Sequence, residues 1–369
     1  MAEPVTWMTR ALALARQARG TTRPNPPVGA ILLRDREVVG QGWTQPAGSD
    51  HAEVMAIKAA GDRARGATLY VTLEPCNHYG RTPPCTEAII AAGIAEVHYA
   101  IPDRNPLTAG QAADRLRRAG IRIVVGEQAS IIERFYRPFF KWITTAQPYV
   151  VAKFAASLDG RVATRTGESQ WITGPVARTR VQDLRQVSDA ILVGAGTVVA
   201  DNPRLTVRLE TSAQAAPCQP LRIVLDSGGR TPAGSAIFDQ PGQTLIAGTD
   251  RLPPEAEARL RDRGAEVLRL PARDGKVDLA ILLGELGRRE ITTLMVEGGA
   301  ATLGSFFDQR LVDETWVFLA PIVIGGVAAP GAVGGLGVAR LSDALRLEDV
   351  ELETIDGDFL IRGYTSPTV

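Results

Sequence analysis

Two stretches, "DHAEVMAIKAAG" (residues 50–61) and "LEPCNHYGRTPPC" (residues 73–85), indicate the fold of the first half of the chain. The first places His51 and Glu53 two residues apart in the first turn of a predicted helix. The second contributes Cys76 and Cys85. The whole chain has three histidines and three cysteines, and two of each fall between residues 51 and 85. This concentration of possible ligands predicts a metal site.

The residue types at this site are those of a catalytic zinc centre. Zinc binds neutral imidazole and thiolate, and a catalytic zinc keeps three protein ligands and one position for water. His51, Cys76 and Cys85 supply these ligands, and the deaminase signature H-x-E…P-C-x-x-C adds a proton-carrying glutamate, here Glu53. The match is partial, because eight residues separate the two cysteines. The predicted reaction is hydrolytic loss of ammonia from a ring carbon.

Each of these residues also has an ordinary interpretation. A histidine at a helix start can be a surface residue, a cysteine can be a small buried hydrophobe, and Glu53 can favour the positive end of the helix dipole. A structural zinc site is a further alternative, but it would use a fourth ligand, for which His78 is the nearby candidate. The occurrence of the residues in signature order favours the catalytic interpretation.

Length and composition exclude several classes of protein. A chain of 369 residues with 45% hydrophobic and 22% charged residues predicts a globular protein of two domains. Basic and acidic residues number 41 each, and this neutral balance argues against nucleic acid as the main partner. No stretch reaches the roughly 18 apolar residues of a membrane span, and the first residues lack the pattern of a signal peptide. Three cysteines make a poor disulfide framework, so we expect a cytoplasmic protein.

Apolar spacing and turn residues predict alternating strands and helices in the first half. Helical periodicity runs from Val5 to Ala18, and the runs at 28–33 and 37–43 predict a hairpin. Further helices are predicted at 51–60, 84–92 and 109–120, and further strands at 68–73, 96–101 and 121–126. This alternation predicts a mostly parallel sheet flanked by helices.

A domain boundary is predicted where Gln147-Pro148 interrupts a helical pattern, which gives domains 1–146 and 147–369. Buried strands of the second half are predicted in "AILVGA" (190–195), "LRIVLD" (221–226), "TLIAG" (244–248), "EVLRL" (266–270) and "TTLMVEGG" (292–299). Residues 210–220 are expected to form a solvated loop, and residues 324–337 a glycine-rich one.

The stretch "AILVGAGTVVAD" (190–201) only partly matches a dinucleotide-binding fingerprint. Gly194 and Gly196 follow a predicted strand, but Val199 stands where the third small residue belongs. The first acidic residue at a strand end, Asp226, comes late. The sequence therefore argues against a classical Rossmann domain.

Together with "TRPNPPVG" (22–29) and "HAEV" (51–54), the motif "TLEPCNHYGRTPPC" (72–85) closely resembles the bifunctional deaminase–reductases of riboflavin biosynthesis, over about residues 5 to 365. The resemblance implies an α/β fold, with a cytidine-deaminase-like three-layer N-terminal domain and a dihydrofolate-reductase-like C-terminal domain. It implies one zinc ion in the first domain and NADPH in the second. The implied substrate is 2,5-diamino-6-ribosylamino-4(3H)-pyrimidinone 5′-phosphate, which is deaminated before its ribosyl group is reduced to a ribityl chain.

The resemblance also implies residue roles in the first half. Base recognition is implied for Asn25, and substrate contacts for His78 and Arg81. Two positions depart from the family pattern: Asn77 stands where many relatives have serine, and Thr44 where several have histidine. The remaining histidine, His98, lies in a predicted strand, and we expect it not to be a ligand.

The second half resembles the family's reductase domain in "KFAASLDGR" (153–161), "GESQWITG" (167–174), "LR" (184–185), "GTVVADNPRLTVR" (196–208), "LDS" (225–227) and "VEGGAATLG" (296–304). These matches imply nucleotide contacts from Ala155, Trp171, Thr197, Asp201, Ser227 and the Gly299–Ser305 turn. They imply substrate contacts from Ser169, Arg185, Leu205, Arg208 and Glu297. On chemical grounds, Lys153 and Asp201 are candidates for proton delivery or orientation.

Elementary chemistry agrees with several of these roles. Two arginines can clamp a phosphate bidentately, and Glu297 can accept hydrogen bonds from sugar hydroxyls. Gly298-Gly299 before a helix allows close approach of a phosphate to the backbone. The preference for NADPH over NADH rests on the resemblance alone, because no residue marks a 2′-phosphate pocket in the sequence.

Two other functions stay open at this point. One is a deaminase of free or nucleic-acid bases with a binding module as its second half, which the neutral charge opposes. The other is a zinc-stabilised interaction protein, which predicts a fourth ligand and a dispensable Glu53. The expected partner is a small phosphorylated pyrimidine, without nucleic acid or membrane, and we expect a homo-oligomer.

Overall fold

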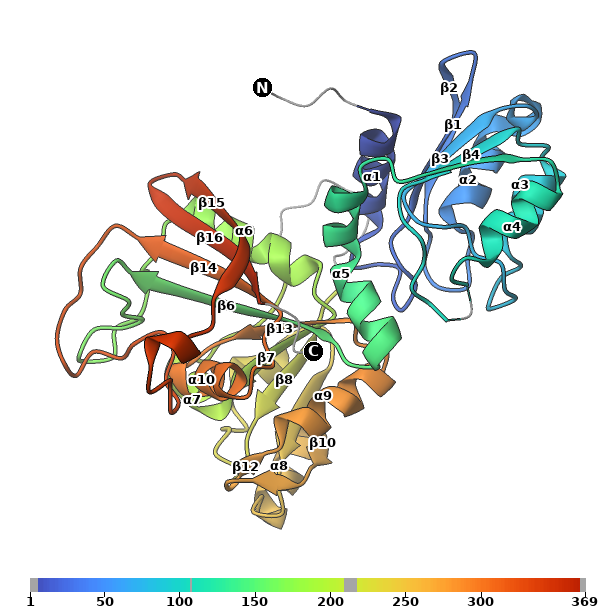
Figure 1. Cartoon of the computed structure of the whole chain (residues 1–369). Coiled ribbons are helices and arrows are strands. Elements are labelled where there is room, and N and C mark those ends of the chain that lie inside the picture. Colours follow the sequence, from blue (N-terminus) through green and yellow to red (C-terminus); the bar gives the residue numbers. More distant parts are fainter. Residues whose placement is uncertain (1–5, 107, 209–217, 366–369) are drawn as a thin grey trace. The chain divides into compact units, whose positions relative to one another are not determined.

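The computed structural model describes residues 6–106, 108–208 and 218–365. By its internal contacts the chain divides into two compact units, Met1–Gln147 (unit 1) and Pro148–Val369 (unit 2). Each unit is built around its own sheet (Figure 1).

The described part of unit 1 contains a five-stranded sheet in the order β2-β1-β3-β4-β5. Its strands are β1 (Gly29–Arg34), β2 (Glu37–Trp43), β3 (Thr68–Val71), β4 (Glu96–Tyr99) and β5 (Arg122–Val125). Its helices are α1 (Trp7–Ala18), α2 (Ala52–Ala60), α3 (Cys85–Ala91), α4 (Gln111–Arg118) and α5 (Ala129–Thr145). Figure 1 shows α1 and α5 on one face of the sheet and α2, α3 and α4 on the other, which gives three layers.

Local sequence explains how these elements begin and turn. The Thr6 hydroxyl accepts the Thr9 N–H at 3.1 Å and caps α1, which therefore begins after Thr6; the expected start at Val5 lies outside the described residues. The predicted hairpin is confirmed, and Asp35 and Arg36 turn it with φ of 50° and 66°.

The sheet of unit 1 is less parallel than the sequence predicts. Strands β3, β4 and β5 run parallel, but β1 pairs antiparallel with both β2 and β3. The expectation was wrong for this unit because the opening hairpin places two strands in the sheet without a helical crossover between them.

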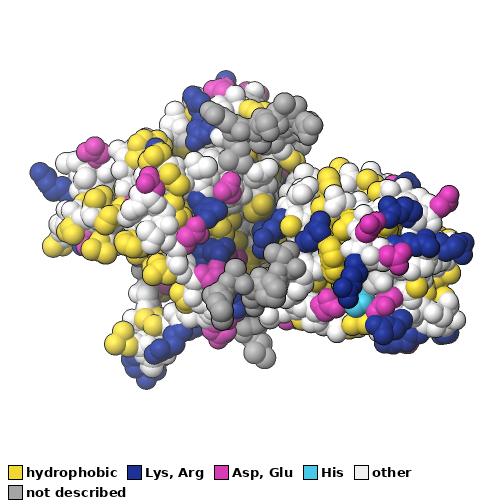
Figure 2. All heavy atoms as spheres, turned by 90° about the horizontal axis from the view of Figure 1, so that it is seen from above, with side chains coloured by type: hydrophobic (Ala, Val, Ile, Leu, Met, Phe, Trp, Pro, Cys, Tyr) yellow, Lys and Arg dark blue, Asp and Glu magenta, His cyan; other side chains and the backbone are white. Residues whose placement is uncertain are grey.

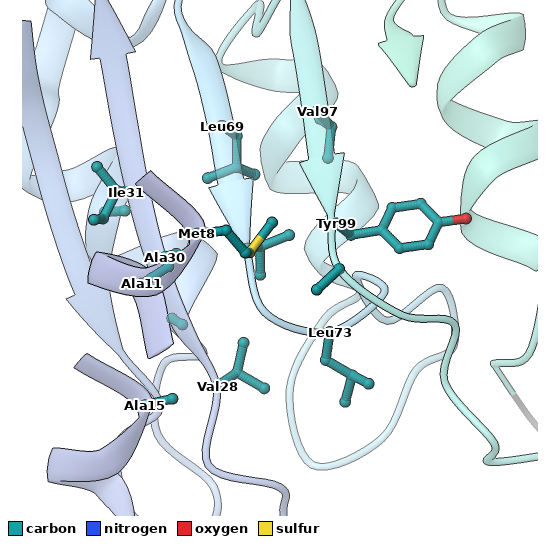
Figure 3. Close-up of a cluster of buried hydrophobic side chains, with 14 of the residues drawn as sticks. Met8, Ala11, Ala15, Val28, Ala30, Ile31, Leu69, Leu73, Val97 and Tyr99 are labelled. Atoms are coloured by element: carbon teal, nitrogen blue, oxygen red, sulfur yellow. The ribbon is translucent and has the colours of Figure 1, made fainter. Parts of the chain in front are cut away.

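Small residues allow the helices of unit 1 to lie close to the sheet. A Cβ on Gly29 would collide with Ala11 and Ala15 of α1, and one on Gly42 would collide with α2. The buried cluster between α1 and the sheet includes Met8, Ile31 and Leu69 (Figure 3). The close contact at Gly42 lets α2 pack directly against β2, which fixes the position of the start of α2 relative to the sheet.

The described part of unit 2 contains a nine-stranded sheet in the order β10-β9-β8-β7-β13-β6-β14-β16-β15. Its strands are β6 (Tyr149–Ser157), β7 (Ala190–Gly194), β8 (Leu221–Leu225), β9 (Thr244–Gly248), β10 (Glu266–Arg269), β13 (Thr293–Glu297), β14 (Glu314–Ala320), β15 (Leu347–Ile355) and β16 (Asp358–Thr365). From β10 to β14 neighbouring strands are parallel, and the last two pairs are antiparallel.

Two buried clusters cover the two faces of this sheet. One face packs against α6 (Pro175–Gln186), α7 (Ala195–Asp201) and α8 (Pro254–Asp262), and the other against α9 (Leu279–Arg288) and α10 (Ala300–Asp308). A short hairpin of β11 (Ala272–Arg273) and β12 (Lys276–Val277) follows β10. The five predicted strands of this half are confirmed as β7, β8, β9, β10 and β13, whereas most of the predicted 210–220 loop lies outside the described residues.

Two aspartates hold the glycine-rich loop 324–337 in place. The Asp159 carboxylate accepts the N–H groups of Ile324 and Gly325 at 3.0 and 2.8 Å. The Asp308 carboxylate accepts those of Leu336 and Gly337 at 2.8 and 3.1 Å. The loop is therefore attached at both of its ends.

None of the helices in the described ranges is long and apolar enough to cross a bilayer. On the face seen in Figure 2, dark blue and magenta side chains are interspersed, in keeping with the equal numbers of basic and acidic residues.

Candidate active sites

His51, Cys76 and Cys85 come together in unit 1. His51 precedes α2 in extended backbone, Cys76 lies in the loop after β3, and Cys85 begins α3. The His51 Nδ1 lies 3.5 Å from the Cys76 Sγ and 3.2 Å from the Cys85 Sγ. The ligand atoms of the three residues all lie within 4.8 Å of one another. This donor set and spacing fit one tetrahedral zinc ion with an open vertex.

His78, the candidate fourth ligand, lies outside this cluster. Its Nδ1 lies 2.9 Å from the Thr108 hydroxyl, and the metal-binding group found among the described residues has three members without it. The neighbouring Asn77 accepts hydrogen bonds from Thr86 at 2.8 Å and Arg115 at 3.1 Å, so it ties the loop to α3 and α4. The predicted substrate residue Arg81 lies exposed in the same loop.

Glu53 is buried in the first turn of α2, with 3% of its surface exposed. Burial, together with the charge of Cys76, raises the pKa of Glu53 to about 7, against the opposing effect of His51. The Cys85 thiol donates to Cys76 and is the main reason that the pKa of Cys76 falls to about 4. A bound divalent cation acts on all these groups in the direction of the deprotonated form.

Two residues that sequence reasoning missed support the metal loop. The Thr82 hydroxyl lies 3.3 Å from the His51 Nε2, the ring nitrogen opposite the cysteines, where it can fix the orientation of the ring. The buried Glu74 carboxylate accepts the N–H groups of Asp103, Gly110 and Ala112 at 3.1 to 3.2 Å. The motif "LEPC" contains Glu74, but nothing local shows that its partners lie so far along the chain.

The other singled-out residues of unit 1 have distinct surroundings. Asn25 is half-buried in the loop between α1 and β1. The Thr44 hydroxyl is buried and accepts the Val28 N–H at 3.0 Å. His98 lies on β4, with its ring nitrogens 2.7 Å from Glu127 and 2.6 Å from Glu96. His98 is therefore a strand histidine outside the metal cluster, as predicted.

A cavity of about 2080 Å³ lies in unit 2. The residues that the resemblance or the chemistry implied for the reductase half line it, together with both ends of the Gly299–Ser305 turn: Lys153, Ala155, Ser169, Trp171, Arg185, Thr197, Asp201, Leu205, Arg208, Ser227, Glu297, Gly299 and Ser305. They come from the carboxyl ends of parallel strands and from the following loops and helices, where ligands of open α/β sheets bind.

Glu297, at the end of β13, is the centre of an ion-pair network in this cavity. Its carboxylate lies 3.1 Å from the Lys153 Nζ and accepts two hydrogen bonds from Arg185 at 3.0 and 2.7 Å. Burial opposes its ionisation, but the charges of Arg185 and Lys153 prevail and lower the pKa of Glu297 to about 2. Arg185 also donates to the Thr206 carbonyl at 3.0 Å, so most of its donors act within the protein.

Two further arginines of the cavity, Arg204 and Arg208, lie near this network. Burial and the neighbouring Arg185 and Arg204 lower the pKa of Arg208. Arg204, which the sequence did not single out, lines the same cavity. On another wall the Arg178 guanidinium lies 4.6 Å from the centre of the Trp171 ring, which is 66% exposed. The cavity thus offers both cationic and aromatic surfaces.

Gly298 and Gly299 form a turn in the wall of the cavity, where no side chain covers the backbone. The Thr197 hydroxyl accepts the Gly299 N–H at 2.9 Å. A Cβ on Gly298, whose φ is 149°, would lie 3.0 Å from the Thr197 Oγ1, and one on Gly299 would lie 3.2 Å from it. Gly299 is also the N-cap of α10, so the turn and the start of the helix together fit a diphosphate.

Comparison with known proteins identifies the families of both units. Residues 148–361 match the family described as the RibD C-terminal domain, and residues 1–101 match the cytidine and deoxycytidylate deaminase zinc-binding region. The riboflavin biosynthesis protein RibD of Escherichia coli is 43% identical over 95% of this chain and 96% of its own length. That of Aquifex aeolicus is 40% identical, with 96% of each chain covered.

Solved structures give the same result. Acinetobacter baumannii RibD superposes with a TM-score of 0.86 at 36% identity, covering 98% of each chain. The diaminohydroxyphosphoribosylaminopyrimidine deaminase/5-amino-6-(5-phosphoribosylamino)uracil reductase of Thermotoga maritima gives 0.84 at 32% identity, with the same coverage.

The chain belongs to the RibD family of riboflavin biosynthesis. As in this family, the chain combines a zinc deaminase domain with a reductase domain. The predicted fold class, an α/β protein with a cytidine-deaminase-like domain followed by a dihydrofolate-reductase-like domain, is confirmed. The family implies zinc in the first half and NADPH in the second, and the donor set of unit 1 and the glycine-lined cavity of unit 2 fit these two groups.

Proposed function

We propose that this chain catalyses two consecutive steps on one phosphorylated pyrimidine. Residues 1–146 replace the 2-amino group of 2,5-diamino-6-ribosylamino-4(3H)-pyrimidinone 5′-phosphate by oxygen, consuming water and releasing ammonia. Residues 147–369 then reduce the ribosyl group of 5-amino-6-(5-phosphoribosylamino)uracil to a ribityl chain, consuming NADPH and a proton. The names of the Thermotoga relative's two activities support this order of substrates.

In the deaminase half, His51, Cys76 and Cys85 hold the zinc ion. Zinc, when bound, supplies a water whose pKa is lowered towards about 7. Glu53, buried in the first turn of α2 two residues after His51, would accept a proton from the attacking water and deliver it to the leaving amino nitrogen. Asn25 binds the substrate from the loop between α1 and β1, and His78 and Arg81 bind it from the loop between Cys76 and Cys85.

In the reductase half, the substrate lies near Glu297. Ser169, Leu205 and Arg208 contact the substrate, and Arg185 orients the Glu297 carboxylate towards the sugar hydroxyls. NADPH supplies the hydride that reaches C1′. Ala155, Trp171, Thr197, Asp201, Ser227, Gly299 and Ser305 bind the nucleotide, and Lys153, next to Glu297, or Asp201 supplies or orients the proton.

The observation that carries this proposal is the three-ligand cluster beside a buried glutamate, in the same chain as a cavity with a glycine turn. The test supplies the diaminopyrimidine substrate with and without NADPH and follows ammonia and the absorbance of the reduced cofactor. Ammonia should be released without NADPH, and NADPH should be consumed only after deamination. NADPH consumption before any ammonia would contradict the proposed order.

We also propose a cytoplasmic homo-oligomer that does not bind nucleic acid. The thiols of the metal site need a reducing compartment. Exposed apolar residues of unit 2, such as Val327, Leu336 and Leu352, offer a surface that a second copy can cover. Light scattering on the purified protein tests the oligomer, and a gel shift with transfer RNA tests the exclusion of nucleic acid.

A further inference from the structure

Four cationic side chains gather in one end of the unit 2 cavity. Arg230 follows β8, Arg251 follows β9, and Arg273 and Lys276 belong to the β11–β12 hairpin. All four line the same cavity as Glu297. Within the described ranges, no carboxylate oxygen lies within the 4.0 Å ion-pair distance of any of these four side chains. Unlike Arg185, they are therefore available to an anionic ligand.

Hydrogen bonds fix the hairpin over the ends of β8 and β9. The Ser227 hydroxyl accepts the Val277 N–H at 3.2 Å, and the Ser227 carbonyl accepts the Thr249 hydroxyl at 2.9 Å. A Cβ on Gly275 would lie 3.0 Å from an Arg251 Nη1, so the absence of a side chain lets this guanidinium lie against the turn. Segments from three places in the sequence thus form one basic wall.

The acidic residue after β8, Asp226, is not available to accept a ribose 2′-hydroxyl. Dinucleotide sites that select NADH place a carboxylate at a strand end, where it accepts the ribose 2′-hydroxyl. Asp226 directly follows β8, but it is 1% exposed and accepts the N–H groups of Arg230 and Thr231 at 2.9 and 2.7 Å. Asp274, in the turn of the hairpin, lines the cavity beside these four cations. Its single negative charge is smaller than their total charge, so this end of the cavity stays positive.

The position of the basic wall matches the far end of a dinucleotide. In the sheet order β9-β8-β7-β13, the wall at β8 and β9 lies two to three strands from Glu297 at the end of β13, or about 10 to 14 Å at the usual strand spacing. The glycine turn and Thr197, which fit the diphosphate, lie between them at β7 and β13. A nucleotide with its nicotinamide near Glu297 therefore carries its adenosine to β8 and β9.

We propose that Arg230, Arg251, Arg273 and Lys276 form the subsite for the 2′-phosphate of NADPH and so select NADPH over NADH. This inference rests on the proposed reductase function and adds the residues that determine its cofactor specificity. Guanidinium and ammonium groups that lack carboxylate partners suit a phosphate monoester, whereas a 2′-hydroxyl gains nothing from them.

The first test measures binding to the whole zinc-loaded protein by calorimetry, with 2′,5′-ADP and 5′-AMP as probes. Arg273→Ala and Lys276→Ala should each weaken 2′,5′-ADP binding about 10-fold, and the double variant more, because each removes a charge-assisted bond. Binding of 5′-AMP should change less than about twofold, which also shows that the site is folded. Arg259→Ala, an exposed cation on α8 outside the cavity, is the matched control.

A second arm separates the 2′-phosphate from the substrate phosphate. Ribose 5-phosphate binding should be unchanged in the double variant, because its cationic partners are Arg204 and Arg208. If the variant loses ribose 5-phosphate and keeps 2′,5′-ADP, the subsite belongs to the substrate and the inference fails. The inference also fails if 2′,5′-ADP binds the double variant as it binds the parent.

Salt and steady-state kinetics complete the test. Raising ionic strength should weaken 2′,5′-ADP binding more than 5′-AMP binding in the parent, and the difference should shrink in the double variant. The ratio of kcat/KM for NADPH to that for NADH should fall in the same variant. A parent protein that reduces no substrate with either cofactor refutes the proposed function, whereas an active parent with an unaffected variant refutes only the subsite.

Discussion

Glu53 is the one ionisable side chain that the deaminase chemistry needs besides the metal ligands. We expect Glu53→Gln to lower ammonia release by about 10²- to 10⁴-fold, because the amide cannot carry a proton between water and the leaving nitrogen. Zinc content and NADPH oxidation on substrate that is already deaminated should stay at the parent level. An assay of ammonia, with zinc measured by atomic absorption, checks this. Unchanged ammonia release would instead favour a structural role for the metal.

Glu297 compensates two buried positive charges, so its loss should affect stability as well as reduction. Glu297→Gln should lower the free energy of unfolding at pH 7 by about 3 to 5 kcal/mol, since Lys153 and Arg185 keep their charges without a carboxylate. Glu255→Gln, on exposed α8, is the control and should change it by less than about 0.5 kcal/mol.

The pH dependence of this loss follows from the lowered pKa of Glu297, about 2. A carboxyl with a lowered pKa stabilises the fold above its ordinary pKa, and this contribution disappears as the pH falls towards the folded value. The stability difference between parent and Glu297→Gln should therefore be constant from pH 8 to about 5 and shrink at lower pH. Urea denaturation across this range measures it, and a difference that grows on acidification would contradict the assignment.

At the scale of elements, α10 lies so close to the glycine-rich loop that its middle residue has no room for a side chain. A Cβ on Gly304 would collide with the backbone of Gly334 and Gly335, whereas one on Gly284 of α9 would meet nothing within 4 Å. Gly304→Ala should lower the free energy of unfolding by about 1 to 3 kcal/mol, and Gly284→Ala should raise it by about 0.5 to 1 kcal/mol. Chemical denaturation of both variants tests this. Equal changes in the free energy of unfolding would show that the loop at Gly334 and Gly335 can move away to accommodate the new side chain.

Most elements could be predicted from the sequence, because their local patterns are strong. The hairpin of β1 and β2 has a turn between two β-rich runs, and the buried strands β7, β8 and β13 are short apolar runs. The direction of strand pairing in unit 1 could not be predicted from the sequence. Whether β1 pairs with β3 in parallel or antiparallel orientation depends on long-range contacts, which local residue spacing does not encode.

At the scale of the whole molecule, the two candidate sites are built from separate sets of residues. The metal cluster lies within Met1–Gln147, and the lining of the large cavity lies within Pro148–Val369. Removing zinc with a chelator should therefore abolish ammonia release and leave NADPH oxidation on deaminated substrate within about twofold of the untreated protein. Adding zinc back should restore ammonia release. Parallel loss of both activities would indicate that unit 2 depends on the metal for its fold.

The sequence by itself was enough to predict the metal ligands, Glu53 and the family, because these residues lie in two short motifs that also carry the family resemblance. Only the tertiary structure decided that Arg185 is held by Glu297, that Asp226 is turned inward, and that Arg251 and Lys276 face one cavity. The physical reason is topological. Parallel strands bring their carboxyl ends to one edge of the sheet, so residues far apart in the chain share a site that no local pattern records.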